Sequence, residues 1–485
     1  MDKLKPIKDR YYLNDLTESQ KATFLDIEKW DSDRNSSNSY VIKGSAGTGK
    51  SYLANKIIKH IFKKRNKRIC VSAPTHKAVR VIENFTGLKG MTIHSLHGLR
   101  PNFNADDFDL NNVQFHTIGN IKLQNYDVVF IDEASMIGKS LKKLNDVRST
   151  EFNTKIVYLG DPLQLAPVKE KGISTIFNIS NQYTLTEIVR QAKTNPILNI
   201  LNILRYDVAD KSDEFIKYII NNRHNIENGL GYTVVGSQGF VKVLKAYYKK
   251  EEYKNNTDFV KIGAFTNNRI QQWNSYVRNS IIKSNEMLVE GDILTGYKTV
   301  VDEYLSPVII NSNDYVVTDV ESRMTDDNFS VFVVSVKDML TGVPSYIYIV
   351  NHLDESFFNF KKKLYLLHSN ARFADTLEKG QLWKIFYNFK DRFLTMIDIP
   401  IEYNDGYYSS VKKEIDYGYA TTVHKLQGST INNIVIDMLD IAYYPPKHVT
   451  LRYNTANVPN AIDNRNRLLY TCISRASEKA IILNR

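Results

Sequence analysis

Short apolar runs alternate with helical patterns in the first third of the chain. Four runs have the length and composition of buried strands: residues 40–42, 69–73, 127–131 and 155–159. The stretch after the first run has apolar residues at the spacing of one helix face: Leu53, Ile57, Ile58 and Ile61. Strands that alternate with helices predict an open α/β sheet in this part of the chain.

The pattern changes twice further along the chain. Residues 99–125 are polar and less regular, which predicts an insertion rather than another strand–helix unit. Residues 287–412 contain short β-type runs that fit a small SH3-like barrel. The segment 357–393 within them is helical, aromatic and rich in lysine. It fits a packing arm, a brace for another segment or a docking site for a partner.

Composition narrows the class of protein. The formal net charge of +11 over 485 residues favours a polyanionic partner such as nucleic acid. No window has the roughly 18 apolar residues of a membrane span, and the N-terminus lacks the apolar core of a signal peptide. The two cysteines, Cys70 and Cys472, form no disulfide framework or Cys-based zinc site. We therefore expect no membrane partner and a cytoplasmic location.

A glycine-rich loop follows the first predicted strand and begins a helix, which is the context of a P-loop. Its backbone N–H groups and the helix N-terminus are expected to bind phosphate oxygens. Lys50 is expected to neutralise the β- and γ-phosphates, and the Ser51 hydroxyl to hold Mg²⁺. The predicted nucleotide-binding residues of this loop are Gly44, Ser45, Ala46, Gly47, Thr48, Gly49, Lys50 and Ser51.

Four further residues add to the predicted nucleotide site. The third apolar run ends in Asp132 and Glu133, which are expected to hold the Mg²⁺ shell and to activate the attacking water, respectively. Gln164 follows the fourth run and is placed to sense a γ-phosphate. Gln20 has capping-box spacing with Thr17, but its amide also suits the adenine edge. The sequence leaves these two roles of Gln20 open.

Two polar loops carry hydroxyl, imidazole and ammonium groups that suit phosphate contacts. In open α/β sheets, ligands meet the loops at the carboxyl ends of strands. The first loop follows the second strand, and the second repeats its chemistry about fifteen residues later. The predicted nucleic-acid contacts in these loops are Pro74, Thr75, His76, Lys77, Thr92 and His94.

The order of these motifs resembles a known family. Four of them are similar to the ordered motifs of superfamily 1 helicases: residues 44–51, 132–134, 160–167 and 190–191. The late motifs of that superfamily resemble residues 419–429 and 469–476. The DNA-contact motifs of subgroup 1B, which includes RecD-like motors and Dda-like phage helicases, are similar to residues 74–78 and 92–96. The chain is identified as a Dda-like member of superfamily 1B.

The resemblance implies two RecA-like P-loop motor domains that clamp ATP and Mg²⁺ between them. The first would span residues 1–190, with a pin-like insertion at 98–125. The second would span 191–485, with the SH3-like insertion and its helical segment at about 287–412. In this arrangement Arg190 and Arg475 are arginine fingers, and Gly428 lies at the nucleotide, whereas Arg465 and Arg467 are expected at the surface.

The resemblance also implies a substrate and a direction. Single-stranded DNA and forked duplexes are the expected partners of a monomeric motor with 5′→3′ polarity. The resemblance also implies a role in phage replication, recombination or repair, with a single-stranded-DNA-binding or replisome protein as a further partner. Further predicted DNA contacts are Phe115, Phe265, Thr422 and His424, and the candidate pin wedge is either Phe115 or Phe103. Each of these two phenylalanines fits equally well a small hydrophobic anchor that holds the loop down. The alternative is a DNA-stimulated ATPase that displaces or remodels nucleoprotein complexes without processive unwinding.

Overall fold

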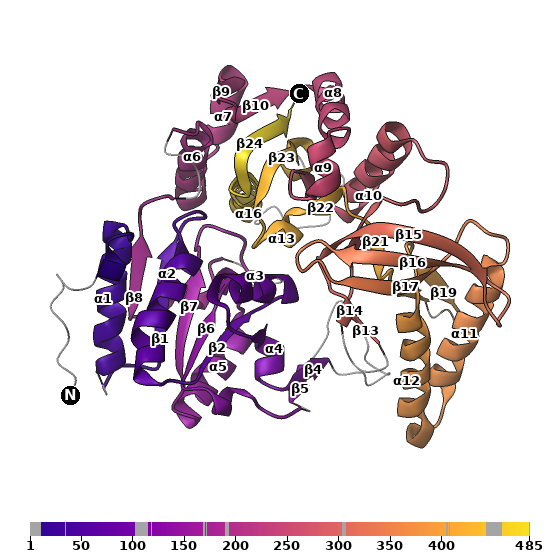
Figure 1. Cartoon of the computed structure of the whole chain (residues 1–485), viewed down its shortest axis with the longest axis horizontal. Helices are drawn as coiled ribbons and strands as arrows, with labels where there is room; N and C mark the ends of the chain where they lie inside the picture. Colours follow the sequence, from indigo (N-terminus) through magenta and orange to yellow (C-terminus); the bar gives the residue numbers. More distant parts are fainter. Residues whose placement is uncertain are drawn as a thin grey trace.

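The computed structural model describes residues 11–33, 35–101, 115–117, 119–167, 170, 172–189, 194–302, 307–403, 406, 408–442 and 458–484. Three six-stranded sheets organise these residues (Figure 1). Two sheets belong to α/β units and are wholly or mainly parallel, and the third is mainly antiparallel. The two α/β units confirm the predicted fold class.

The first α/β unit has the strand order β3-β2-β6-β7-β1-β8, with every neighbouring pair parallel. Its strands are β1 (Ser39–Gly44), β2 (Ile69–Ala73), β3 (Gly90–Thr92), β6 (Val128–Ile131), β7 (Lys155–Gly160) and β8 (Gln182–Leu185). Its helices are α1 (Glu18–Ser32), α2 (Lys50–Ile57), α3 (His76–Thr86), α4 (Ile93–Leu96) and α5 (Lys139–Glu151). The inner strands β1, β2, β6 and β7 are mostly apolar because an apolar cluster buries each face of the sheet.

The second α/β unit has the order β22-β11-β23-β24-β10-β9, in which only β9 is antiparallel to its neighbour among the described strands. Its strands are β9 (His224–Glu227), β10 (Leu230–Val235), β11 (Val260–Ala264), β22 (Ala420–Thr422), β23 (Ile431–Asp437) and β24 (Ala476–Leu483). Its helices are α6 (Ile197–Asp210), α7 (Glu214–Asn221), α8 (Ser237–Tyr248), α9 (Glu251–Asn255), α10 (Asn267–Tyr276), α13 (Val423–Leu426), α14 (Met438–Ala442) and α16 (Val458–Ile473). The predicted domain division after residue 190 falls between β8 and α6.

The third sheet interrupts the second unit between β11 and β22. Its order is β18-β17-β16-β15-β12-β21, formed by β12 (Ile293–Gly296), β15 (Asp314–Met324), β16 (Ser330–Asp338), β17 (Pro344–Val350), β18 (Phe393–Leu394) and β21 (Ile415–Tyr417). Helices α11 (Phe357–Phe373) and α12 (Thr376–Arg392) pack on each other and extend from this sheet (Figure 1). The strand β21 lies beyond the predicted limit of residue 412, and the SH3-like classification stays a prediction.

Three two-stranded hairpins complete the described strands. They are β4 (Leu99–Pro101) with β5 (Phe115–Thr117), β13 (Val300–Val301) with β14 (Pro307–Ile309), and β19 (Ile399–Glu402) with β20 (Tyr408–Val411). The first hairpin lies within the predicted insertion at 98–125, whose residues 102–114 and 118 are outside the described part of the chain. The pin assignment therefore stays a prediction. No helix among the described residues is long and apolar enough to cross a bilayer.

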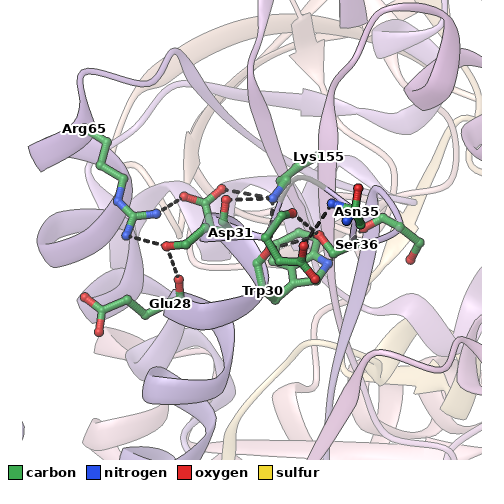
Figure 2. A network of polar contacts seen from close by, with 10 residues as sticks. Glu28, Trp30, Asp31, Asn35, Ser36, Arg65 and Lys155 are labelled. Atoms are coloured by element: carbon green, nitrogen blue, oxygen red, sulfur yellow. Dashed lines mark hydrogen bonds and ion pairs between the residues drawn. The ribbon is translucent and has the colours of Figure 1, made fainter. Parts of the chain in front are cut away.

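A buried carboxylate anchors the C-terminal end of α1 (Figure 2). The side chain of Asp31 is 3 % exposed and pairs with Arg65, which follows α2, and with Lys155 Nζ at 3.4 Å. Lys155 also donates to the carbonyl oxygens of Trp30 at 3.1 Å and Asp31 at 3.0 Å. The network ties α1 to β7, and α1 carries Gln20 near its other end.

Candidate nucleotide site and strand-binding loops

The predicted phosphate loop connects β1 to α2 with the geometry that its glycines allow. Gly47 and Gly49 have φ of 87° and 76°, a left-handed conformation that favours glycine. Lys50 is the first residue of α2, and its Nζ donates to the carbonyl oxygens of Gly44 at 2.8 Å and Ser45 at 3.1 Å. The ammonium group therefore lies over the loop, at the N-terminal end of a helix, where an anion is stabilised.

Gln20 takes the structural role that its spacing predicts and also contacts the phosphate loop. Its Oε1 accepts from the Thr17 N–H at 3.0 Å, and its own N–H donates to the Thr17 hydroxyl at 3.4 Å, which completes the capping box of α1. Its Nε2 donates to the carbonyl oxygen of Thr48 at 2.9 Å. Both ends of the amide are thus engaged within the protein, and the adenine contact stays a prediction.

The two acidic residues lie at the end of β6, beside the phosphate loop. The Ser51 hydroxyl donates to Asp132 Oδ2 at 3.4 Å. A hydroxyl and a carboxylate are the oxygen ligands that Mg²⁺ takes at phosphate sites, so the predicted metal residues fit the ion. Among the described residues, no cluster of three or more His, Cys, Asp or Glu side chains could bind a metal by itself. At phosphate sites, Mg²⁺ takes its further ligands from waters and from the substrate's phosphates.

Glu133 has an unusual backbone and a perturbed carboxyl group. Its φ of 53° is left-handed, a conformation that costs a non-glycine residue about 1–3 kcal/mol and occurs often at functional sites. Burial, and then the charge of Asp132, raise its pKa, whereas the positive charges of Arg475 and Lys50 oppose the shift. A carboxyl group with a raised pKa next to a phosphate site suits a general base.

Asp161 forms a hub that the sequence did not predict as a site residue. Its Oδ2 accepts the Ala46 N–H at 3.0 Å and Gln164 Nε2 at 3.3 Å. Gln164 is only 4 % exposed, so the predicted γ-phosphate sensor is held against the phosphate loop through Asp161. The Ala46 N–H is committed to Asp161 in this structure, and the nucleotide-binding assignment of Ala46 stays a prediction. The sequence signal that could have identified Asp161 is its place as the acidic residue of the motif at 160–167.

Helix α16 brings groups of the second unit onto this hub. The Tyr470 hydroxyl donates to Asp161 Oδ2 at 2.8 Å. Arg467 Nη1 donates to the carbonyl oxygens of Pro162 at 2.7 Å and Gln164 at 2.9 Å. The prediction that Arg467 lies at the surface is wrong: it is 5 % exposed, because it crosses between the two units.

Two other predicted residues of the second unit lie at the same junction. Arg475 is 2 % exposed, and its Nε donates to the Thr471 carbonyl oxygen at 3.2 Å. Its charge acts on the Glu133 carboxyl across the junction. Gly428 has a left-handed φ of 77°, and a Cβ at this position would lie 3.5 Å from Glu133 Oε1. The nucleotide assignments of both residues stay predictions.

Arg190 lies outside the described residues, and the segment before it is bound to the phosphate loop. The Val189 N–H donates to the Gly47 carbonyl oxygen at 2.7 Å. Glu187 accepts from the hydroxyl of Ser19 and, at 3.2 Å, from that of Thr17, both at the start of α1. The bond from Ser19 makes the largest contribution in lowering the pKa of Glu187 to about 2. Sequence reasoning missed Glu187, whose partners are far away in the chain.

The two predicted strand-binding loops of the first unit are the N-terminal ends of helices. Thr75 caps α3 by accepting the Ala78 N–H at 3.2 Å, and Thr92 caps α4 by accepting the Ser95 N–H at 3.2 Å. A capping hydroxyl keeps its own proton for donation to a phosphate. Burial, and then the charge of His76, lower the pKa of His94. Pro74, His76 and Lys77 lie where the first loop begins α3.

The second unit contributes a similar loop. Thr422 is the N-cap residue of α13, and the ring of His424 in that helix lies 6.2 Å from the ring of Phe265, centroid to centroid. Phe265 follows β11, and Asp440 Oδ2 accepts its N–H at 2.7 Å. Phe115 begins β5, opposite Pro101. The DNA-binding roles of these residues stay predictions.

Comparisons with known proteins agree with this architecture. A family model described as an AAA domain matches residues 32–217. The ATP-dependent DNA helicase dda of Enterobacteria phage T4 is 25% identical over 459 residues, which cover 87% of this chain and 92% of that protein. The ATP-dependent DNA helicase Pif1 of Campylobacter jejuni is 23% identical over 436 residues, which cover 87% of each protein.

The structure of the Pif1 helicase from Candida albicans matches with a TM-score of 0.52 at 18% identity, covering 97% of this chain and 94% of that one, which shows a shared fold. Two α/β units with the helicase motifs at their junction, and relatives matched over nearly their full length, lead to one assignment. These similarities support the superfamily 1B helicases as the family that the chain resembles.

Proposed function

We propose that this chain is an ATP-hydrolysing motor that moves 5′→3′ along single-stranded DNA and unwinds duplex DNA at forks. One observation carries the proposal: the junction between the units joins groups of both at the predicted γ-phosphate position. Glu133 and Gln164 come from the first unit, and Tyr470 and Arg475 from the second. A site built in this way couples the state of the nucleotide to the distance between the units. The polarity rests on the 1B resemblance.

The residues of the site divide the chemistry among them. Lys50 and the loop N–H groups bind and orient the phosphates, and Glu133 takes a proton from the attacking water. Mg²⁺ held by Ser51 and Asp132 would neutralise charge that develops on the phosphate oxygens. Arg475 and Arg190 stabilise the same charge as arginine fingers, an effect worth about 10³–10⁵ in rate in other phosphoryl-transfer enzymes.

Strand binding follows from the position of the polar loops. Thr75 follows β2, Thr92 ends β3, and Thr422 ends β22. Both units therefore offer helix N-termini and hydroxyl groups to the phosphates of single-stranded DNA. Such contacts are made to phosphates and carry no base specificity. The nucleotide draws the two units together and hydrolysis releases them. The DNA-binding loops of the two units would therefore bind the DNA strand in alternation. We propose that the motor acts as a monomer in the cytoplasm.

The test is unwinding of forks that carry a tail on only the 5′ or only the 3′ side. The wild type is expected to unwind the 5′-tailed substrate with ATP and Mg²⁺, and Lys50→Ala is expected to unwind neither. Unwinding from the 3′ tail alone would contradict the polarity. DNA-stimulated ATP hydrolysis without unwinding from either tail would instead favour an ATPase that remodels nucleoprotein complexes.

A further inference from the structure

One face of α16 holds the loop that follows β7. Asp463, Arg467 and Tyr470 are spaced at i, i+4 and i+7, so they lie along one side of the helix. Asp463 Oδ1 accepts Arg467 Nε at 3.0 Å and orients the guanidinium group. Arg467 then reaches the carbonyl oxygens of Pro162 and Gln164, and Tyr470 reaches the Asp161 carboxylate. Figure 1 shows α16 on the side of the second unit that faces the first.

The loop at 161–164 is in turn bound to the phosphate loop. Asp161 Oδ2 accepts the Ala46 N–H at 3.0 Å, and the same oxygen accepts the Tyr470 hydroxyl at 2.8 Å. One buried oxygen therefore joins the phosphate loop of the first unit to α16 of the second. Asp161 is 2 % exposed, so water does not replace a lost partner easily, and each bond to this charge is strong.

The side-chain amide of Gln164 has a defined orientation in this arrangement. Its Nε2 donates to Asp161 at 3.3 Å, whereas the opposite orientation would place two acceptors against each other. Its Oε1 is buried and has no hydrogen-bond partner in the described structure. The loop thus holds the Gln164 amide in one orientation, with its buried oxygen unpaired, and α16 holds the backbone from which this side chain extends.

We propose that Arg467 and Tyr470 are positioning residues that transmit the nucleotide state of the first unit to the strand grip of the second. The inference rests on the proposed function and assigns the coupling to these two side chains rather than to the arginine fingers alone. When the units separate, the Tyr470–Asp161 and Arg467–carbonyl bonds break, and the loop that carries Gln164 loses its support. When the units close, the same bonds set the position of Gln164.

The test uses Tyr470→Phe, which removes one hydroxyl and leaves the ring. Its matched control is Tyr40→Phe, because the Tyr40 hydroxyl donates to the Asp26 carboxylate at 2.5 Å wholly within the first unit. Single-stranded DNA affinity is measured with ADP and with a non-hydrolysable ATP analogue, and the ratio of the two dissociation constants reports the coupling. ATP turnover is measured at saturating DNA, with KM and kcat separated.

Tyr470→Phe is expected to bring the ratio of dissociation constants close to one and to lower kcat about tenfold, with KM for ATP changed less than about twofold. Tyr40→Phe is expected to keep the wild-type ratio and kcat. A second variant, Arg467→Lys, keeps the charge but loses the planar donor and is expected to reduce the ratio as well.

The outcomes separate the inference from the proposed function. If the wild type shows no nucleotide-dependent DNA affinity, the proposed function fails. If the wild type shows it and Tyr470→Phe keeps it, or if Tyr40→Phe loses it equally, the coupling role of Tyr470 is wrong. A double-mutant cycle with Asp161→Asn checks the pair directly, because the two changes are expected to be non-additive.

Discussion

At the scale of single residues, Glu133 is the side chain whose backbone conformation and charged neighbours bear most directly on the proposed chemistry. Its backbone is left-handed, its carboxyl group is next to that of Asp132, and two cations approach it from different parts of the chain. Burial and the Asp132 charge make the protonated form easier to populate, and Lys50 and Arg475 offset this effect. The balance leaves a carboxylate that binds a proton more readily than an exposed glutamate does, which is what a general base requires.

Glu133→Gln is expected to lower kcat by about 10²–10⁴-fold with little change in ATP binding, because the amide cannot accept the proton. The pKa of Glu133 is raised above 4.5, so the acid limb of kcat/KM against pH in the wild type is expected above that value, with activity lost as the pH falls. Steady-state turnover against pH checks both expectations. Glu151→Gln, at the exposed end of α5, is the control. An acid limb at or below 4.5 would contradict the assignment.

At the scale of elements, the position of α1 depends on contacts at both of its ends. Asp31 near its C-terminus pairs with Arg65 and Lys155, and Thr17 and Ser19 near its N-terminus pair with Glu187. Gln20, which contacts the phosphate loop, lies between these two anchors. The anchors explain how a helix beside the edge strand β8 supports the loop that follows the neighbouring strand β1.

Asp31→Asn is expected to lower the free energy of unfolding by about 2 kcal/mol, the range of a hydrogen-bonded charge that loses its partner. Both cations reach solvent in part, with side chains 31% and 18% exposed, so the loss stays below that of a fully buried pair. Urea unfolding of the wild type and of Asp31→Asn measures this change in the free energy of unfolding. Glu214→Gln, at an ion pair whose side chains are 63% and 60% exposed, is expected to change stability very little. Equal effects of the two substitutions would contradict the anchor.

At the scale of the whole molecule, the proposed DNA-binding surface would combine the net charge of +11 with the polar loops of both units. The third sheet adds a contact to it, because Asp338 at the end of β16 pairs with Arg80 in α3, the helix that Thr75 caps. The grip of the first unit is therefore connected both to the second unit and to the inserted sheet.

Lys77→Ala and His94→Ala are expected to weaken single-stranded DNA binding in different ways. His94 has a lowered pKa, because of burial and then the charge of His76, so it is neutral at pH 7.5 and binds a phosphate by hydrogen bonding alone. Lys77→Ala is expected to reduce the slope of log K against log salt by about 0.7, and His94→Ala to leave it unchanged. Titrations at several salt concentrations check this. A reduced slope for His94→Ala at pH 7.5 would contradict it.

Much of the fold was predictable because its signals are local. The strands at 40–42, 69–73, 127–131 and 155–159 are contiguous apolar runs, and the structure contains β1, β2, β6 and β7 there. Arg467 was mispredicted for the opposite reason. It lies on a helix beside other polar residues, and nothing near it in the sequence shows that its partners are the carbonyl oxygens of Pro162 and Gln164.

The sequence by itself determined the phosphate loop and the order of the motifs, since eight contiguous residues carry the loop and glycines set its backbone. Only the tertiary structure decided how the phosphate loop of the first unit is connected to helix α16 of the second. Asp161 meets Ala46 across 115 positions and Tyr470 across 309, and these partners have no common local pattern. A hydrogen bond depends on distance and direction in space, so the folded junction had to show that the glycine-rich loop and helix α16 bind the same carboxylate oxygen.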